Sequence, residues 1–263
     1  MVDPSDTGRF TKDALYEGRL TLHQPRRGYR FSVDAPLLTW FAYGPKPAAS
    51  AVDLGAGCGV IGLGLLASGG ARTVTAIEVQ PELAALCARN AAANGLEGSC
   101  RVVEANLFED HPDLRPGSYD LIVSNPPFSK AGTGRLPENP QRKLACCEVT
   151  GDLEGWIGAA ARLASRSRGR LAVVFPARRL DDLMSSFGAA GLAATRLRMV
   201  HPKPGAGADL VLAEARIGSP GRLSVEPPLV LRDEGDKDTE ETAAILSGRF
   251  SLPLRALPDK RRG

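Results

Sequence analysis

The sequence predicts an α/β protein with a mostly parallel β-sheet and helices on both of its faces. Short apolar, β-prone runs alternate with Ala- and Leu-rich stretches between residues 51 and 175, which is the pattern of successive βαβ units. Two more β-prone runs, at 195–200 and 210–217, are separated by prolines and glycines, as in an antiparallel pair. We therefore expect a sheet that is parallel at its centre and mixed at one edge.

Each predicted element follows from its local composition. The helix expected at 81–93 opens with Pro81, a residue favoured in the first turn, and closes at Asn94-Gly95, a common helix stop. The helix expected at 60–67 follows a glycine-rich turn. Strands are expected at 51–54, 73–79, 100–105, 119–123, 171–175, 195–200 and 210–217.

The chain is expected to comprise a lead-in at 1–50, a core at 51–218 and a peripheral C-terminal segment at 219–263. The charges of residues 1–17 are scattered without an apolar period, so we expect a loose tail or a short helix there. Residues 18–31 predict two extended pieces around a Pro/Gly turn, and a helix capped near Ser32 or Asp34 follows them.

The composition is that of a folded, soluble protein, because 43% of the 263 residues are hydrophobic and 24% are charged. The apolar runs at 121–123 and 171–176 are far shorter than the roughly 20 residues that cross a bilayer. We therefore expect no membrane contact and a cytoplasmic location. The five cysteines include no Cys-x-x-Cys pair and the three histidines are dispersed, so we expect neither a disulfide framework nor a metal site.

The charge of the chain is small overall but uneven. The net charge is +3, whereas the stretch from Arg162 to Lys203 carries nine basic residues and two acidic ones. Such a stretch is typical of a phosphate-facing surface, and equally of solvated helix faces in an arginine-rich protein. The sequence alone leaves both interpretations open.

A glycine-rich loop follows the first predicted core strand and admits two interpretations. In the first, Gly57-x-Gly59-x-x-Gly62 satisfies the dinucleotide-binding fingerprint. Glu78 lies 21 residues beyond Gly57, close to the separation expected for a carboxylate on a ribose. This interpretation predicts an NAD(P)-binding oxidoreductase.

In the second interpretation the loop is Asp53-x-Gly55-x-Gly57-x-Gly59, which resembles motif I of class I S-adenosylmethionine-dependent methyltransferases. The resemblance implies a Rossmann-like, mostly parallel seven-stranded sheet with an antiparallel edge strand, and S-adenosylmethionine as the cofactor. It places Asp53, Gly55 and Gly57 at the cofactor. It also makes Glu78 the acceptor for both ribose hydroxyls, since two carboxylate oxygens match two vicinal donors.

A second motif separates these interpretations. Ser124-Asn125-Pro126-Pro127-Phe128 resembles the Asn-Pro-Pro-Phe/Tyr signature of methyltransferases that act on planar nitrogen, for which nicotinamide enzymes give no reason. An adenine amine is a poor nucleophile because its lone pair is delocalised. The Asn125 side-chain oxygen and the Pro126 carbonyl can accept its N–H bonds and favour a more tetrahedral nitrogen, aimed at the methyl group. Phe128 can stack on the extruded base, and Asn125 is expected at both cofactor and base.

Blocks on both sides of the core narrow the resemblance to the tRNA adenine-N6 methyltransferases that modify adenosine 37 of tRNA1(Val). These blocks are 24–38, 201–206, 210–215, 227–229 and 239–241. The resemblance implies methylation of adenine N6 in RNA, with tRNA as the expected substrate, and a lead-in that covers the cofactor site. Asn106 stands where the family often has an Asp for the cofactor's adenine amine. Cys146-Cys147-Glu148 stands where it tends to have Arg-His-Glu.

We therefore expect a tRNA-modifying enzyme that forms N6-methyladenosine, with RNA as its partner, acting as a monomer or small homo-oligomer. Phe128, Arg135 and Lys203 are the candidate substrate contacts, and Arg135 lies in a basic, Gly/Pro-containing stretch typical of a mobile substrate loop. Four alternatives stay open. They are a protein glutamine-N5 methyltransferase, a ribosomal-RNA or DNA methyltransferase, an NAD(P)-binding oxidoreductase and a non-catalytic S-adenosylmethionine-binding RNA module.

Overall fold

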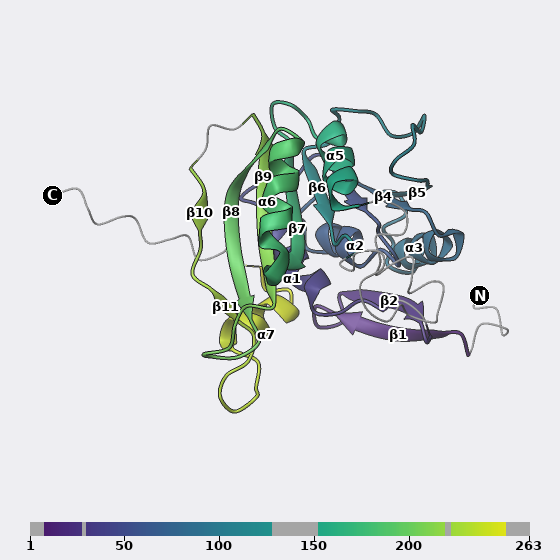
Figure 1. Cartoon of the computed structure of the whole chain (residues 1–263). Helices are drawn as coiled ribbons and strands as arrows, with labels where there is room; N and C mark the ends of the chain where they lie inside the picture. Colours follow the sequence, from purple (N-terminus) through teal and green to yellow (C-terminus); the bar gives the residue numbers. More distant parts are fainter. Residues whose placement is uncertain (1–7, 28–29, 128–151, 219–221, 251–263) are drawn as a thin grey trace.

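The computed structural model describes residues 8–27, 30–127, 152–218 and 222–250 (Figure 1). Its centre is a nine-stranded sheet in the order β10-β8-β9-β7-β6-β3-β4-β5, with β11 paired to β8 as well. The strands of this sheet are β3 (Ala51–Leu54), β4 (Val74–Glu78), β5 (Cys100–Glu104), β6 (Leu121–Ser124), β7 (Arg170–Pro176), β8 (Leu192–His201), β9 (Leu210–Ile217), β10 (Ser224–Val225) and β11 (Leu229–Val230).

The mostly parallel sheet predicted from the sequence is confirmed, and β10 and β11 extend it beyond the seven strands expected. Strands β3 to β7 are mutually parallel, and β9 pairs antiparallel with both β7 and β8. The antiparallel strand thus lies one position inside β8, and the short strands β10 and β11 cover part of the outer side of β8. Because β8 runs in the same direction as β3 to β7, all six strands end at one edge of the sheet, which we call the carboxyl edge.

Helices cover both faces of the sheet because alternate strand residues point to opposite sides. In β6, Leu121 and Val123 belong to one core cluster, which includes residues of α1, α2, α3 and α7, whereas Ile122 belongs to the other, which includes residues of α5 and α6. The helices are α1 (Asp34–Ala42), α2 (Val60–Ala67), α3 (Pro81–Ala93), α5 (Leu153–Leu163), α6 (Leu180–Ala189) and α7 (Glu240–Leu246). Within the described ranges, no helix is long and apolar enough to cross a membrane.

The lead-in differs from its prediction. Residues 10–15, expected in a loose tail or short helix, form the strand β1 (Phe10–Leu15), which pairs antiparallel with β2 (Leu20–Pro25). The turn of this hairpin lies at Tyr16, Glu17 and Gly18, which all have positive φ, and not at the expected Pro/Gly turn. The first strand carries no strong apolar pattern because its exposed and half-buried residues alternate, so its strand character depends on its partner.

Asn90 of α3 and Asn94, which caps its C-terminal end, hold this hairpin against the core. The Asn94 Oδ1 atom accepts a hydrogen bond from the Thr21 N–H at 2.9 Å. Asn90 is fully buried, and its Oδ1 accepts from the His23 N–H at 2.8 Å. Its Nδ2 group donates to the carbonyl oxygens of His23 and Cys58, both at 2.9 Å. Asn90 therefore connects the hairpin directly to the glycine-rich loop.

The described part of the C-terminal segment is attached to the core through Arg198 on β8. The Nη1 and Nη2 atoms of Arg198 donate to the two carboxylate oxygens of Glu241 on α7, each at 2.8 Å, and its Nε donates to the Pro227 carbonyl at 2.9 Å. The guanidinium also lies 5.0 Å from the centroid of the Trp40 ring. These contacts fix α7 on the same face as α1.

Candidate active site

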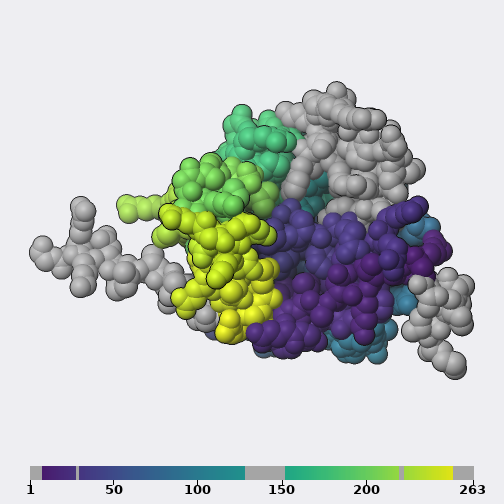
Figure 2. Space-filling view, turned by 90° about the horizontal axis from the view of Figure 1, so that it is seen from below, coloured from purple at the N-terminus to yellow at the C-terminus, as the bar shows by residue number. Residues whose placement is uncertain are grey.

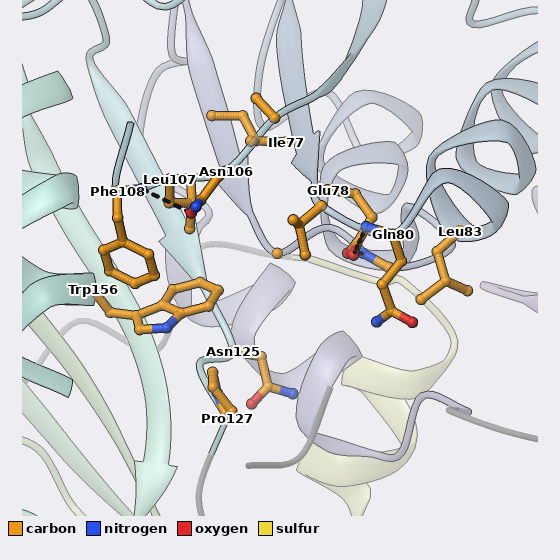
Figure 3. Close-up of a pocket in the computed structure, with 14 residues that line it drawn as sticks. Ile77, Glu78, Gln80, Leu83, Asn106, Leu107, Phe108, Asn125, Pro127 and Trp156 are labelled. Atoms are coloured by element: carbon orange, nitrogen blue, oxygen red, sulfur yellow. Dashed lines mark hydrogen bonds between the residues drawn. The ribbon is translucent and has the colours of Figure 1, made fainter. Parts of the chain in front are cut away.

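A pocket opens at the carboxyl edge, where the loops after β3, β4, β5 and β6 meet α5 (Figure 3). It encloses about 600 Å³ of empty space, including open solvent at its mouth. Its position is that of ligands in open parallel sheets. Gly55, Gly57, Glu78, Asn106 and Asn125 all line it, so the structure brings these five predicted residues together.

The loop between β3 and α2 requires glycine for both conformation and space. Gly55, Gly57 and Gly59 have φ values of 70°, 57° and 90°, in the left-handed region that side chains other than glycine rarely adopt. A Cβ atom on Gly55 would lie 2.7 Å from a ring carbon of Trp156, and one on Gly59 would lie 2.6 Å from the Cys87 Sγ atom. The loop can therefore pass close to neighbouring groups and to a ligand.

Glu78, at the end of β4, is buried beside this loop. Its Oε2 atom accepts a hydrogen bond from the Gly57 N–H at 2.8 Å, and its Oε1 accepts from the Gln80 N–H at 2.9 Å. Burial raises the pKa of the carboxyl, while these backbone hydrogen bonds oppose the rise. Since each carboxylate oxygen has capacity for a further bond, the residue can hold the loop and still accept from ligand hydroxyls.

Asp53 occupies a different position from the one expected. The alternation along β3 directs its side chain toward α2, behind the loop, and Asp53 does not line the pocket. Its Oδ2 accepts a hydrogen bond from the Gly62 N–H at 2.8 Å, while its Oδ1 is buried without a partner among the described residues. Burial raises the pKa of Asp53 to about 7. Here the carboxyl group supports the loop from within the core.

Two aromatic residues that the sequence analysis did not assign to the site form one wall. Phe108 and Trp156 meet edge to face, with ring centroids 6.3 Å apart, and both line the pocket (Figure 3). Trp156 packs in the core beneath α5 and also faces the pocket. Its Nε1 atom is buried without a partner among the described residues. The one available signal for Phe108 was its place two residues after Asn106.

Asn106 is engaged within its own turn. Its Oδ1 accepts a hydrogen bond from the Phe108 N–H at 3.1 Å, and its Nδ2 donates to the Glu109 carboxylate at 2.7 Å. The amide therefore presents an oriented oxygen at the pocket wall, with one further acceptor position. A role toward the cofactor's adenine amine stays a prediction.

Asn125 follows β6 directly and lines the pocket, where its Oδ1 atom is buried without a hydrogen-bond partner in the described part of the chain. Of the two prolines that follow, Pro127 lines the pocket, whereas Pro126 is buried and does not. The predicted role of the Pro126 carbonyl stays a prediction. Phe128, Arg135 and the Cys146-Cys147-Glu148 motif lie outside the described residues.

The basic stretch from Arg162 to Lys203 is mostly neutralised by its own surroundings. Seven of its nine basic residues make ion pairs, and Lys203 pairs with Asp236 at 3.0 Å. Arg166 and Arg178 are exposed and have no ion pair within the described ranges. Lys203 follows β8, three strand positions or roughly 15 Å from β6, and does not line the pocket. The stretch is thus no continuous phosphate-facing surface.

The expected cover over the site is also not formed by the described lead-in. No residue of 8–27 or 30–50 lines the pocket. The hairpin instead packs beside α2 and α3, and it is connected to the glycine loop through Asn90. Whether 1–50, 51–218 and 219–263 are separate units stays a prediction.

The fold and the site together define a class of protein, the class I S-adenosylmethionine-dependent methyltransferases. A solved structure of a predicted O-methyltransferase from Agrobacterium tumefaciens shares the fold with a TM-score of 0.64 and 24% identity, covering 82% of this chain and 96% of that chain. A family model described as "Methyltransferase small domain" matches residues 37–137. The fold and this family imply S-adenosylmethionine as methyl donor, and the left-handed glycine loop beside Glu78 fits such a ligand.

Sequence relatives define the family more closely. The tRNA1(Val) (adenine(37)-N6)-methyltransferase of Porphyromonas gingivalis is 35% identical over 205 residues, which cover 75% of this chain and 78% of that protein. The protein of the same name from Pedobacter heparinus is 28% identical over 186 residues, covering 69% and 76%. The chain belongs to the tRNA1(Val) (adenine(37)-N6)-methyltransferase family. This assignment leaves no support for the oxidoreductase interpretation.

Proposed function

We propose that the protein transfers a methyl group from S-adenosylmethionine to the exocyclic N6 of an adenine in tRNA. Its relatives carry the name of this activity, and its core carries the site described above. The observation that supports the reaction type best is the Asn125 Oδ1 atom, a buried acceptor without a partner among the described residues, in the same pocket as Glu78. An unpaired buried acceptor costs about 1–3 kcal/mol, so the site favours a ligand that brings an N–H donor.

The pocket offers a donor as well as an acceptor. The Trp156 Nε1–H group is unpartnered like the Asn125 oxygen, and the two side chains line the same pocket (Figure 3). The amino edge of adenine presents an N–H donor next to a ring-nitrogen acceptor, which complements such a pair. A glutamine amide presents a similar pair, so the substrate class must be measured.

The chain's own groups act mainly by positioning. The bound cofactor supplies an electrophilic methyl group. Glu78 and the glycine loop would hold the cofactor, and Asn125 would hold the amine N–H so that the nitrogen lone pair is directed at the methyl carbon. An acceptor in a water-excluded pocket also stabilises the positive charge that develops on the nitrogen during transfer. The nitrogen becomes acidic as it is alkylated, so its proton can leave to solvent without a side-chain base.

Mass spectrometry of nucleosides from purified tRNA tests the proposal. A strain that lacks the gene should lose N6-methyladenosine from one tRNA, and a copy of the wild-type gene should restore it. Asn125→Ala should not restore it, because transfer should fall by at least about 100-fold. The purified variant should still bind S-adenosylhomocysteine in calorimetry. Unchanged N6-methyladenosine in tRNA of the deletion strain, with methylglutamine lost from a protein, would replace the proposal by the protein-substrate alternative.

A further inference from the structure

Three exposed arginines lie on two elements near the carboxyl edge, the hairpin that packs on α3 and the turn after β7. Arg26 and Arg27 follow β2, and Arg178 follows β7. All three side chains are without an ion pair or hydrogen bond within the described ranges. Most other basic residues near the sheet are paired, as the stretch from Arg162 to Lys203 shows, so these three are available to an external anion.

The end of the hairpin that carries Arg26 and Arg27 is linked to the first turn of α3, at the carboxyl edge. The Arg26 N–H donates to the Arg9 carbonyl at 2.8 Å, and the Arg9 side chain lies 3.6 Å from Glu82 in the first turn of α3. Gln80 and Leu83, on either side of Glu82, line the pocket. The purple N-terminal segment forms a large part of the face seen in Figure 2. The Arg9–Glu82 pair is highly exposed and therefore weak, and it leaves the charges of Arg26 and Arg27 unpaired within the described ranges.

Arg178 lies on the other side of the pocket. It is in the single turn that follows β7, and β7 is the neighbour of β6, whose end carries Asn125. From the end of β7 to the end of β4 is three strand spacings, or roughly 15 Å. Along this edge, Asn125 lies between Arg178, which follows β7, and the first turn of α3, which follows β4.

We propose that Arg26 and Arg27 on one side, and Arg178 on the other, bind the phosphate backbone of tRNA so that the target base enters the pocket at Asn125. This proposal rests on the proposed function. Arginine suits the task because its planar guanidinium donates two parallel hydrogen bonds to a phosphate. The phosphate contacts of the three arginines would supply affinity and position the tRNA on the protein, while the pocket would select the base.

Arg166 provides a matched control. It is exposed and unpaired within the described ranges like Arg178, and it belongs to the same basic stretch, but it precedes β7 at the opposite edge of the sheet. The seven residues of β7 separate the two positions by roughly 23 Å. The proposal requires that Arg178 contributes to tRNA binding and that Arg166 does not.

The test measures binding of an unmodified tRNA transcript between about 50 and 200 mM salt. Each phosphate contact removed should lower the slope of log K against log[salt] by about 0.9, and weaken binding roughly eightfold at 0.1 M salt. Arg178→Ala should show the change in salt slope and affinity expected for the loss of one phosphate contact. The Arg26→Ala/Arg27→Ala variant should show the change expected for the loss of two. Arg166→Ala should match the wild type, and all variants should bind S-adenosylhomocysteine normally.

Equal tRNA affinity and salt slope for the Arg178→Ala, Arg26→Ala/Arg27→Ala and Arg166→Ala variants would overturn the proposed surface. The wild-type protein is assayed for N6-methyladenosine formation on the same transcript. If it methylates the transcript while the variants match the control, only the surface is wrong. If the wild type neither binds nor methylates tRNA, the proposed function is wrong, and the surface proposal falls with it.

Discussion

Replacing Asp53 by Asn is expected to stabilise the folded protein at neutral pH and to flatten the pH dependence of its stability. The Asp53 side chain is wholly buried, and only one of its oxygens has a partner within the described ranges. Burial raises its pKa from 3.8 to about 7, the Gly62 hydrogen bond opposes the rise, and the charge of Glu78 adds to it. The charged form is therefore costly in the folded state.

The sign and size of the effect follow from these pKa values. Between about pH 4 and pH 7 the folded protein keeps the proton that the unfolded chain has lost, so the free energy of unfolding falls as the pH rises through this range. A difference of about 3 pKa units corresponds to about 4 kcal/mol. An Asn keeps the acceptor for the Gly62 N–H but leaves an uncharged donor unpaired, at about 1–3 kcal/mol. The net gain above about pH 7 is about 2 kcal/mol.

Urea unfolding of both proteins near pH 5 and near pH 8 measures this effect. The Asp53→Asn variant should exceed the wild type near pH 8 and lose its advantage near pH 5. Asp110→Asn is the control, because the Asp110 side chain is fully exposed and should leave the pH dependence unchanged. If the stability difference between Asp53→Asn and wild type is the same at both pH values, the buried carboxyl is not the titrating group and the reasoning fails.

Other substitutions test how the site and the fold are held. Glu78→Gln keeps only one acceptor oxygen for two backbone N–H groups. Calorimetry should therefore show an affinity for S-adenosylhomocysteine that is at least tenfold weaker, a loss of about 1.4 kcal/mol. An unchanged Kd would contradict the role of the carboxylate. Gly55→Ala places a Cβ atom 2.7 Å from the Trp156 ring at a residue with a φ of 70°. The thermal unfolding midpoint should therefore fall by an amount equivalent to about 1–3 kcal/mol. An unchanged midpoint would show that the Trp156 side chain can move to accommodate the methyl group. In Arg198→Lys the side chain cannot form both hydrogen bonds to Glu241. Urea unfolding should show a loss of about 1–2 kcal/mol of stability, with unaltered cofactor affinity. Equal stability would show that the hydrogen bonds between Arg198 and Glu241 do not stabilise the fold.

Sequence reasoning located elements most accurately where glycine or proline marks their ends. Strand β3, strand β9 and helices α2 and α3 begin and end as predicted. The strand Phe10–Leu15 could not be found in the same way, because one side of a hairpin strand faces solvent and its residues read as polar. Its structure is decided by pairing with β2, which is a tertiary contact and not a local preference.

The same distinction applies to the site. Gly55, Glu78 and Asn125 stand at strand ends, and parallel strands bring such ends to one edge, so their proximity could be predicted. The aromatic wall of Phe108 and Trp156 depends on how α5 packs against the loop after β5, and no spacing in the sequence encodes that contact. The direction of the Asp53 side chain likewise depends on which face of the sheet α2 covers.

The buried amide of Asn90 couples the docking of the hairpin to the conformation of the glycine-rich loop. One side chain satisfies the hairpin backbone at His23 and the glycine-loop carbonyl at Cys58, so undocking the hairpin would leave polar atoms of Asn90 unpaired beneath the loop. By thermodynamic linkage, a ligand that binds better to the ordered loop also strengthens the attachment of the hairpin. A polyanion that binds better to the docked hairpin strengthens the binding of that ligand to the same extent. Cofactor and nucleic acid would then bind cooperatively through a residue that touches neither of them.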